Sequence, residues 1–129
     1  MSKLVLVVDD EKDIREVFQQ VLELEGYRVS AVKNGKEALE WLRNSKEKPS
    51  LILLDLMMPV MDGYEFLVEL RSRAALAAIP IVIITAAGNA RGEAAKLGAA
   101  GHLQKPFKLD ELLATIERIR DGASTTSAE

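Results

Sequence analysis

Residues 51–63 read LILLDLMMPVMDG, and this stretch decides the fold. The four aliphatic residues at positions 51–54 predict a strand buried on both faces, as in a parallel sheet. Asp55 follows them directly. Because a lone buried carboxylate is costly, Asp55 must be hydrogen-bonded, paired with a cation or bound to a metal ion.

Strands and amphipathic helices alternate along the rest of the chain. Strand patterns occur at residues 4–8, 27–32, 51–55, 81–85 and 102–104. Helical spacing of apolar residues occurs around 14–22 and 38–42, and at 64–73, 90–97 and 109–120. Short connections between them predict an α/β fold, the flavodoxin-like (βα)5 three-layer sandwich, with a parallel five-stranded sheet of order 2-1-3-4-5.

The composition fits one globular domain without a membrane span or a nucleic-acid surface. Of the 129 residues, 48% are hydrophobic and 29% are charged, and the net charge of -3 leaves no basic excess. No apolar run approaches the roughly 18 residues of a membrane helix. The absence of cysteine excludes disulfides and is compatible with a cytoplasmic location. We expect one domain at residues 1–120 and a disordered tail or linker at 121–129.

Polar side chains stand where the predicted strands end. Asp9 and Asp10 follow the first strand, Asp55 ends the third, Thr85 ends the fourth and Lys105 follows the fifth. Ligands of open α/β sheets bind outside these carboxyl ends. Three clustered carboxylates repel one another, and a cation relieves that repulsion. Oxygen ligands without histidine or cysteine favour Mg²⁺, for which Mn²⁺ can substitute.

Four sequence pieces carry a family resemblance, and they occur in order on the predicted elements. They are LVLVVDD, LLDLMMPVMDGYEF, IPIVIITA and GAAGHLQKPF. With them the chain resembles the CheY-like receiver domains of response regulators in two-component signalling. The resemblance covers about residues 3–120, nearly the whole chain.

The resemblance implies a phosphoacceptor and a metal site. Asp55 would take a phosphoryl group from a phosphohistidine on a histidine kinase or phosphotransfer protein. Asp9 and Asp10 would bind Mg²⁺ together with Asp55 and the backbone carbonyl of Met57. Positioning and charge neutralisation are the general means of catalysing phosphoryl transfer.

Further residues would act on the phosphorylated state. Thr85 resembles the switch hydroxyl, and Lys105 resembles the lysine that pairs with the phosphoryl group. The bond from Lys105 to Pro106 is cis in the family, and only an X-Pro bond adopts cis cheaply. Met57 and Ala87 occupy the positions that flank the hydrolytic water, and so would set the phosphoryl lifetime. Pro59 and Gly63 would shape the loop after Asp55.

Two departures from the family pattern bear on output. His102 stands where the family usually has Tyr or Phe, three residues before Lys105. We expect it to be packed or half-exposed and to repack in the switch. The stretch from residue 85 to 105 is also about two residues shorter than usual. It leads into the expected output face, formed by the fourth helix, fifth strand and fifth helix.

Simpler roles for these residues remain open. Asp9 and Asp10 could cap the first helix. Thr85 could be an ordinary β-branched strand residue, and Lys105 could be solvated. Asp62 and Glu11 read as solvated side chains.

The sequence favours a signalling module over an enzyme that turns over a separate substrate. Its partners would be the phosphodonor and a downstream target or output domain, with no nucleic acid or membrane, in a monomer or a phosphorylation-dependent dimer. One alternative is a phosphatase or phosphotransferase, which needs a second aspartate near Asp55 and a cap. Others are a phosphorylation-independent pseudo-receiver and a nucleotide-binding protein, the latter lacking a glycine-rich phosphate loop.

Overall fold

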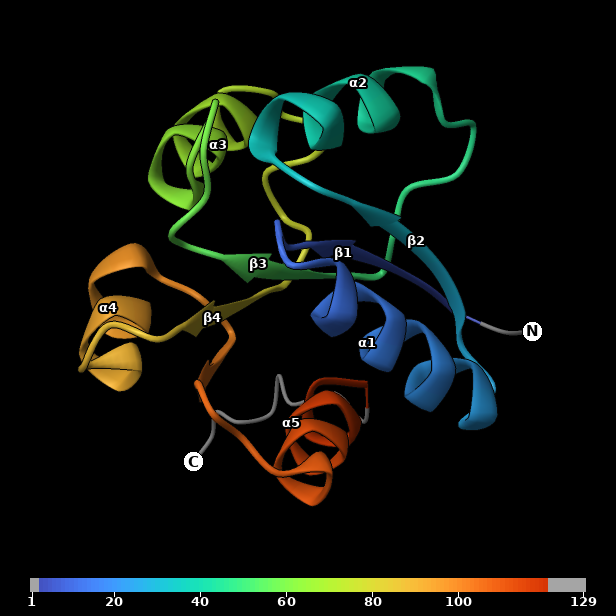
Figure 1. Ribbon diagram of the computed structural model, residues 1–129. Coiled ribbons are helices and arrows are strands. Elements are labelled where there is room, and N and C mark those ends of the chain that lie inside the picture. Colours follow the sequence, from blue (N-terminus) through green and yellow to red (C-terminus); the bar gives the residue numbers. More distant parts are fainter. Residues whose placement is uncertain (1–2, 121–129) are drawn as a thin grey trace. The chain divides into compact units, whose positions relative to one another are not determined.

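The computed structural model describes residues 3–120, so the expected tail at 121–129 lies outside the described residues. Five strands and five helices alternate, and the parallel strands follow the order β2-β1-β3-β4-β5, which confirms the predicted fold class (Figure 1). The chain divides into two compact units, one ending at Ile79 and one beginning at Pro80. Among the described residues, no helix is long and apolar enough to cross a membrane.

The first unit is a three-stranded sheet with helices on both faces. Its elements are β1 (Leu4–Val8), α1 (Lys12–Leu24), β2 (Arg28–Val32), α2 (Gly35–Asn44), β3 (Leu51–Asp55) and α3 (Gly63–Arg71). In Figure 1, α1 covers one face of this sheet and α2 and α3 cover the other. Every residue of β1 and β3 is buried, as the apolar runs predict, whereas the edge strand β2 is partly exposed.

The second unit contains β4 (Ile81–Thr85), α4 (Ala90–Leu97), β5 (Gly101–Gln104) and α5 (Leu109–Arg120). The strands β4 and β5 are parallel, and Thr85 is the register partner of Gln104. Helix α4 begins at the cap Asn89 and ends at Gly98, whose φ of 66° is left-handed. The peptide bond between Lys105 and Pro106 is cis.

Two elements differ slightly from their predicted bounds. Helix α3 begins at Gly63 and ends at Arg71, two residues earlier than predicted, and β5 begins at Gly101. The start of α3 is fixed by Asp62, which sequence reasoning had treated as a solvated residue. Its side chain accepts the Glu65 amide, and the Glu65 side chain accepts the Asp62 amide. This reciprocal pair is a capping box.

Candidate functional site

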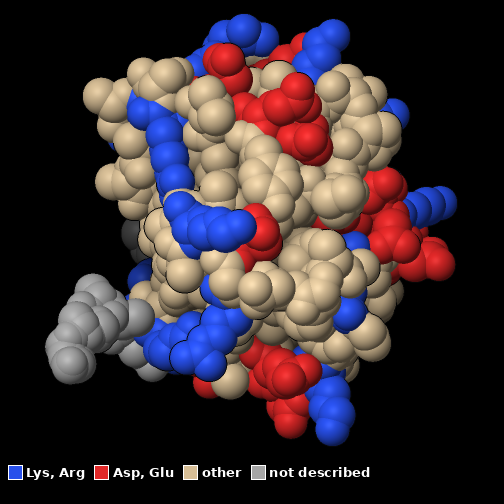
Figure 2. Space-filling view, turned by 90° about the vertical axis from the view of Figure 1, so that its left-hand side faces the viewer, with Lys and Arg blue, Asp and Glu red and all other residues tan. Residues whose placement is uncertain are grey.

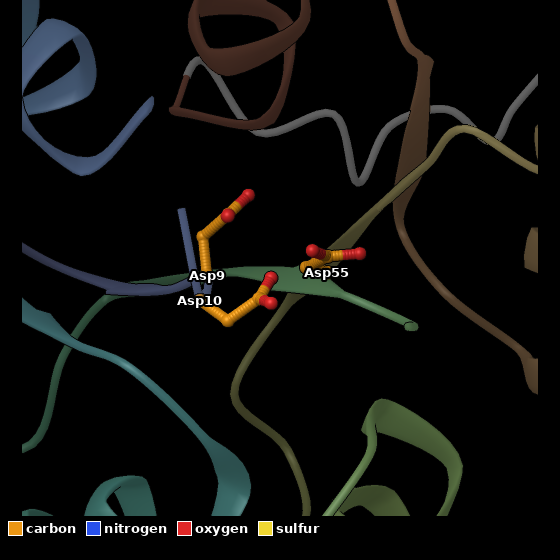
Figure 3. Close-up of side chains that lie close together, drawn as sticks. All are labelled: Asp9, Asp10 and Asp55. Carbon is orange, nitrogen blue, oxygen red and sulfur yellow. The ribbon is translucent and has the colours of Figure 1, made fainter. Parts of the chain in front are cut away.

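Three carboxylates meet at the ends of β1 and β3. Ligand oxygens of Asp9, Asp10 and Asp55 all lie within 4.8 Å of one another. Figure 3 shows the Asp10 carboxylate directed toward Asp55, with Asp9 beside them. Asp9 is 0% exposed and Asp55 is 3% exposed, whereas Asp10 is exposed to solvent. The cluster is therefore anchored in the core and open on one side.

Short local hydrogen bonds orient the two buried carboxylates. Oδ1 of Asp9 accepts the backbone amide of Glu11 at 2.9 Å, and Oδ1 of Asp55 accepts that of Met57 at 3.0 Å. Both bonds span two residues, the pattern of an Asx-turn. The Arg15 guanidinium also donates to the backbone carbonyl of Asp9 at 2.8 Å. Each strand end is thus held rigidly where its carboxylate emerges.

The donor set of the cluster fits a hard divalent cation. At about 4 Å, two like charges repel by about 4 kcal/mol at an effective dielectric of 20. Three carboxylates so close together therefore gain from a bound cation. Their oxygen atoms suit Mg²⁺, which takes one or two carboxylates and keeps several waters. The exposed Asp10 side leaves room for those waters.

The loop between β3 and α3 is packed tightly against the site. A Cβ on Gly63 would lie 2.7 Å from the Asp55 carbonyl oxygen and 2.8 Å from the Leu56 Cα. Gly63 also donates its amide to the Leu56 carbonyl at 3.1 Å. Only glycine allows α3 to begin so close to the strand that ends in Asp55.

A strained turn forms the outer part of the same loop. Val60 has a φ of 70°, and the Met61 amide bonds the Pro59 carbonyl at 2.8 Å across it. A γ-turn with positive φ is rare and strained, above all for a β-branched residue. The Gly35 amide bonds the Met61 carbonyl at 3.0 Å, which ties the turn to the start of α2.

The second unit brings Thr85 and Lys105 together through the backbone. Thr85 is 0% exposed, and its Oγ1 accepts the Ala87 amide at 3.1 Å. The Lys105 amide donates to the Thr85 carbonyl at 2.8 Å. His102 is exposed rather than packed. It lines a groove of about 400 Å³ together with Leu103, Gln104, Pro106, Glu111, Ala114, Thr115 and Arg118.

The Lys105 neighbour Gln104 is a residue that sequence reasoning missed. Its side chain bonds Thr85, Ala87 and Ala90, which lie 14 to 19 residues earlier in the chain. No periodicity or local motif signals such contacts. The Asp62 capping box, in contrast, could have been found from its Asp-x-x-Glu spacing.

Comparison with known proteins decides the family. The model of the response regulator receiver domain matches residues 5–117. The chain belongs to this family. This membership is consistent with a role in two-component signalling.

Curated relatives of this receiver domain are longer proteins. The probable transcriptional regulator ycf27 of Pyropia yezoensis is 42% identical over 127 residues, which cover 95% of this chain and 50% of that protein. The response regulator MprA of Mycolicibacterium vanbaalenii is 36% identical, with 99% of this chain and 57% of that protein covered. The chain therefore spans about half the length of the curated relatives it matches.

Solved structures of similar size share the fold of this receiver domain. The chemotaxis response regulator CheY4 of Vibrio cholerae is 34% identical, with a TM-score of 0.82 and coverage of 92% of this chain and 99% of that chain. The signal receiver domain of a signal transduction histidine kinase from Syntrophus aciditrophicus is 30% identical, with a TM-score of 0.83 and coverage of 99% and 97%.

Proposed function

We propose that this receiver domain is a phosphoacceptor whose Asp55 takes a phosphoryl group from a phosphohistidine on a histidine kinase or phosphotransfer protein. The observation that carries the proposal is the cluster of Asp9, Asp10 and Asp55 at the ends of neighbouring strands. Family membership supports it, because the match at residues 5–117 includes all three aspartates.

The chemistry assigned to Asp55 is a displacement at phosphorus. A carboxylate oxygen of Asp55 forms the new O–P bond while the N–P bond to the donor imidazole breaks, and the product is an acyl phosphate. The Met57 amide, 3.0 Å from Oδ1 of Asp55, holds the carboxylate in one orientation for this attack. Pre-orientation of this kind is a main source of rate in phosphoryl transfer.

Mg²⁺ is the proposed cofactor, with Mn²⁺ as a substitute. Its ligands would be the carboxylates of Asp9, Asp10 and Asp55 and the backbone carbonyl of Met57. The bound ion would offset the negative charge that the incoming phosphoryl group adds to this site. Asp10 is the exposed member of the cluster, so it lies on the side from which ion and donor enter.

Thr85 and Lys105 are the proposed contacts of the transferred phosphoryl group. Their positions at the end of β4 and after β5 support this assignment, because sites of open α/β sheets form at the carboxyl ends of strands. The proposed output face consists of α4, β5 and α5, with Thr85 and His102 as its switch residues. Phosphorylation adds about 1.5 to 2 negative charges, enough to reposition a hydroxyl donor.

The module would act as a switch and would catalyse only its own phosphorylation and dephosphorylation. We propose a receiver domain at residues 1–120 and a downstream protein target or output domain as its partner. Figure 2 shows acidic and basic side chains interspersed with uncharged ones over the face in view. That mixture supports a protein partner rather than nucleic acid.

Phosphoryl uptake from acetyl phosphate in the presence of Mg²⁺ tests the function. Intact mass should show one added phosphoryl group on the parent protein and none on Asp55→Asn, because an amide is a poor nucleophile. Asp110→Asn, which removes an exposed carboxylate from α5, is the matched control and should label normally. Undiminished labelling of Asp55→Asn would disprove the assignment.

A further inference from the structure

A single side chain, that of Gln104, fastens the loop between β4 and α4 at three points. Its Nε2 donates to the carbonyl of Thr85 at 3.1 Å and to that of Ala87 at 2.9 Å. Its Oε1 accepts the amide of Ala90 at 3.0 Å. The bonds begin at the last residue of β4 and end at the first residue of α4.

The pattern of donors and acceptors requires a carboxamide. The two carbonyls need donors, and the Ala90 amide needs an acceptor, so a primary amide satisfies all three while a carboxylate satisfies only one. Ala90 is the first residue of α4 and is 2% exposed. Its amide is among the N-terminal amides that receive no partner within a helix. Gln104 therefore fixes the start of α4 as well as the loop.

The same bonds restrain the surroundings of the Thr85 hydroxyl. Oγ1 of Thr85 accepts the amide of Ala87, while the carbonyl of Ala87 is held by Gln104. The Thr85 carbonyl receives the Gln104 side chain and also the Lys105 amide. A rotation of Thr85 away from Ala87 would break its own bond while Gln104 keeps Ala87 in place.

We propose that Gln104 is a positioning residue that latches the β4–α4 loop in the conformation seen here and thereby opposes the switch. This inference rests on the proposed role of Thr85 as the switch hydroxyl. Releasing the latch lets Ala87 and the start of α4 follow Thr85, which raises the population of the switched conformer before phosphorylation. By linkage, a more populated switched conformer takes up phosphoryl groups faster if phosphorylation favours it.

Amide hydrogen exchange of the unphosphorylated protein tests the latch without any phosphoryl chemistry. In Gln104→Met, which removes all three bonds, the Ala90 amide should exchange about two- to tenfold faster, the range expected from one net hydrogen bond. Amides of the buried α5 residues Leu112 and Ile116 should exchange as in the parent. In Gln104→Glu, the carboxylate still accepts the Ala90 amide, so Ala90 should stay protected while chemical shifts at Thr85 and Ala87 change.

Phosphoryl uptake from acetyl phosphate with Mg²⁺ tests the coupling to the switch. Gln104→Met should take up phosphoryl groups about two- to tenfold faster than the parent, since that is the gain expected from one lost restraint. Gln20→Met, the same chemical change at an exposed position of α1, is the matched control and should match the parent in exchange and uptake.

The outcomes separate the latch from the proposed function. Unchanged exchange at Ala90, or exchange that accelerates equally in α5, overturns the latch whatever the uptake shows. Faster exchange at Ala90 with unchanged uptake overturns its link to the switch. If the parent itself takes up no phosphoryl group, the proposed function fails, and with it the link, while the exchange data still decide whether Gln104 holds the loop.

Discussion

Asp9 and Asp55 lie side by side because the residues before them, Val8 and Leu54, are register partners in parallel strands. Parallel strands present their carboxyl ends at the same sheet edge, so two residues that follow partnered positions must meet there. Asp10, the next residue after Asp9, completes the cluster within 4.8 Å. A shift of one residue in the β1–β3 register would separate the two carboxylates and turn their side chains to opposite faces.

Mg²⁺ should stabilise the folded protein, because a cation relieves the repulsion among Asp9, Asp10 and Asp55. At ten times its dissociation constant the gain should be about 1.4 kcal/mol. Asp10→Asn should reduce this gain, and Asp110→Asn, a control for the loss of one charge, should keep it. The measurement is the melting temperature with and without millimolar Mg²⁺. A melting curve that does not respond to Mg²⁺ would refute the metal site.

Gly63→Ala should destabilise the protein by about 1–3 kcal/mol, because overpacking against backbone atoms forces them to move. The new Cβ would meet the Asp55 carbonyl at 2.7 Å, so phosphoryl uptake should fall as well. Gly88→Ala is the control, since its Cβ would meet nothing within 4 Å, and its effect should stay within about 0.5 kcal/mol. Urea unfolding of both variants makes the comparison, and equal midpoints would contradict it.

Val60→Gly should stabilise the protein by about 1 kcal/mol. Glycine adopts the φ of 70° without the strain that valine carries there, and this gain outweighs its larger loss of backbone entropy. Val60 is 75% exposed, so little burial is lost. Val68→Gly, at a similarly exposed site inside α3, should instead lower the stability by a few tenths of a kcal/mol. Thermal unfolding of the two variants should therefore shift in opposite directions.

Stability should depend on the ion pair of Arg28 and Glu47 above the acid range only. Hydrogen bonds of 2.7 and 2.6 Å from Arg28 are the main cause that lowers the pKa of Glu47; desolvation opposes them, and the charge of Arg28 adds to them. Because the folded-state pKa lies below the unfolded value of about 4.3, the stabilisation is present above that pH and is lost as pH falls through the folded pKa.

Glu47→Gln tests this pH dependence through the difference in urea midpoint between parent and variant. The difference should be present at about pH 6 and shrink at about pH 3, where the parent carboxylate is protonated. Glu40→Gln, at an exposed position of α2, controls for the loss of one charge. A difference that stays constant over this range would count against the ion pair.

The lifetime of the phosphorylated state should respond to Met57 and Ala87. Met57 is 61% exposed and offers no side-chain group that orients water, so Met57→Asn should speed dephosphorylation. Ala87 is also exposed, and Ala87→Tyr should slow it by covering the approach of water. The decay of phosphorylated protein after removal of the donor measures both. A Met57→Asn variant that decays no faster than the parent would exclude water positioning at this residue as the limiting step.

The sequence by itself determined the element order, the buried strands and the three aspartates, because these follow from short-range patterns. An apolar run long enough for one strand specifies burial on both faces, and a carboxylate after it marks the carboxyl end of that strand. The ordered motifs around Asp9, Asp55, Thr85 and Lys105 then indicated the receiver family that the comparison establishes.

Only the tertiary structure decided which groups hold the loops around these residues. Gln104 reaches Thr85 and Ala90 because β4 and β5 are paired in one register, and no pattern within a few residues of Gln104 encodes that pairing. The need for glycine at position 63 likewise depends on how closely α3 approaches the Asp55 carbonyl. Contacts between residues distant in the chain arise from strand register and loop path, which are properties of the assembled fold rather than of any local stretch.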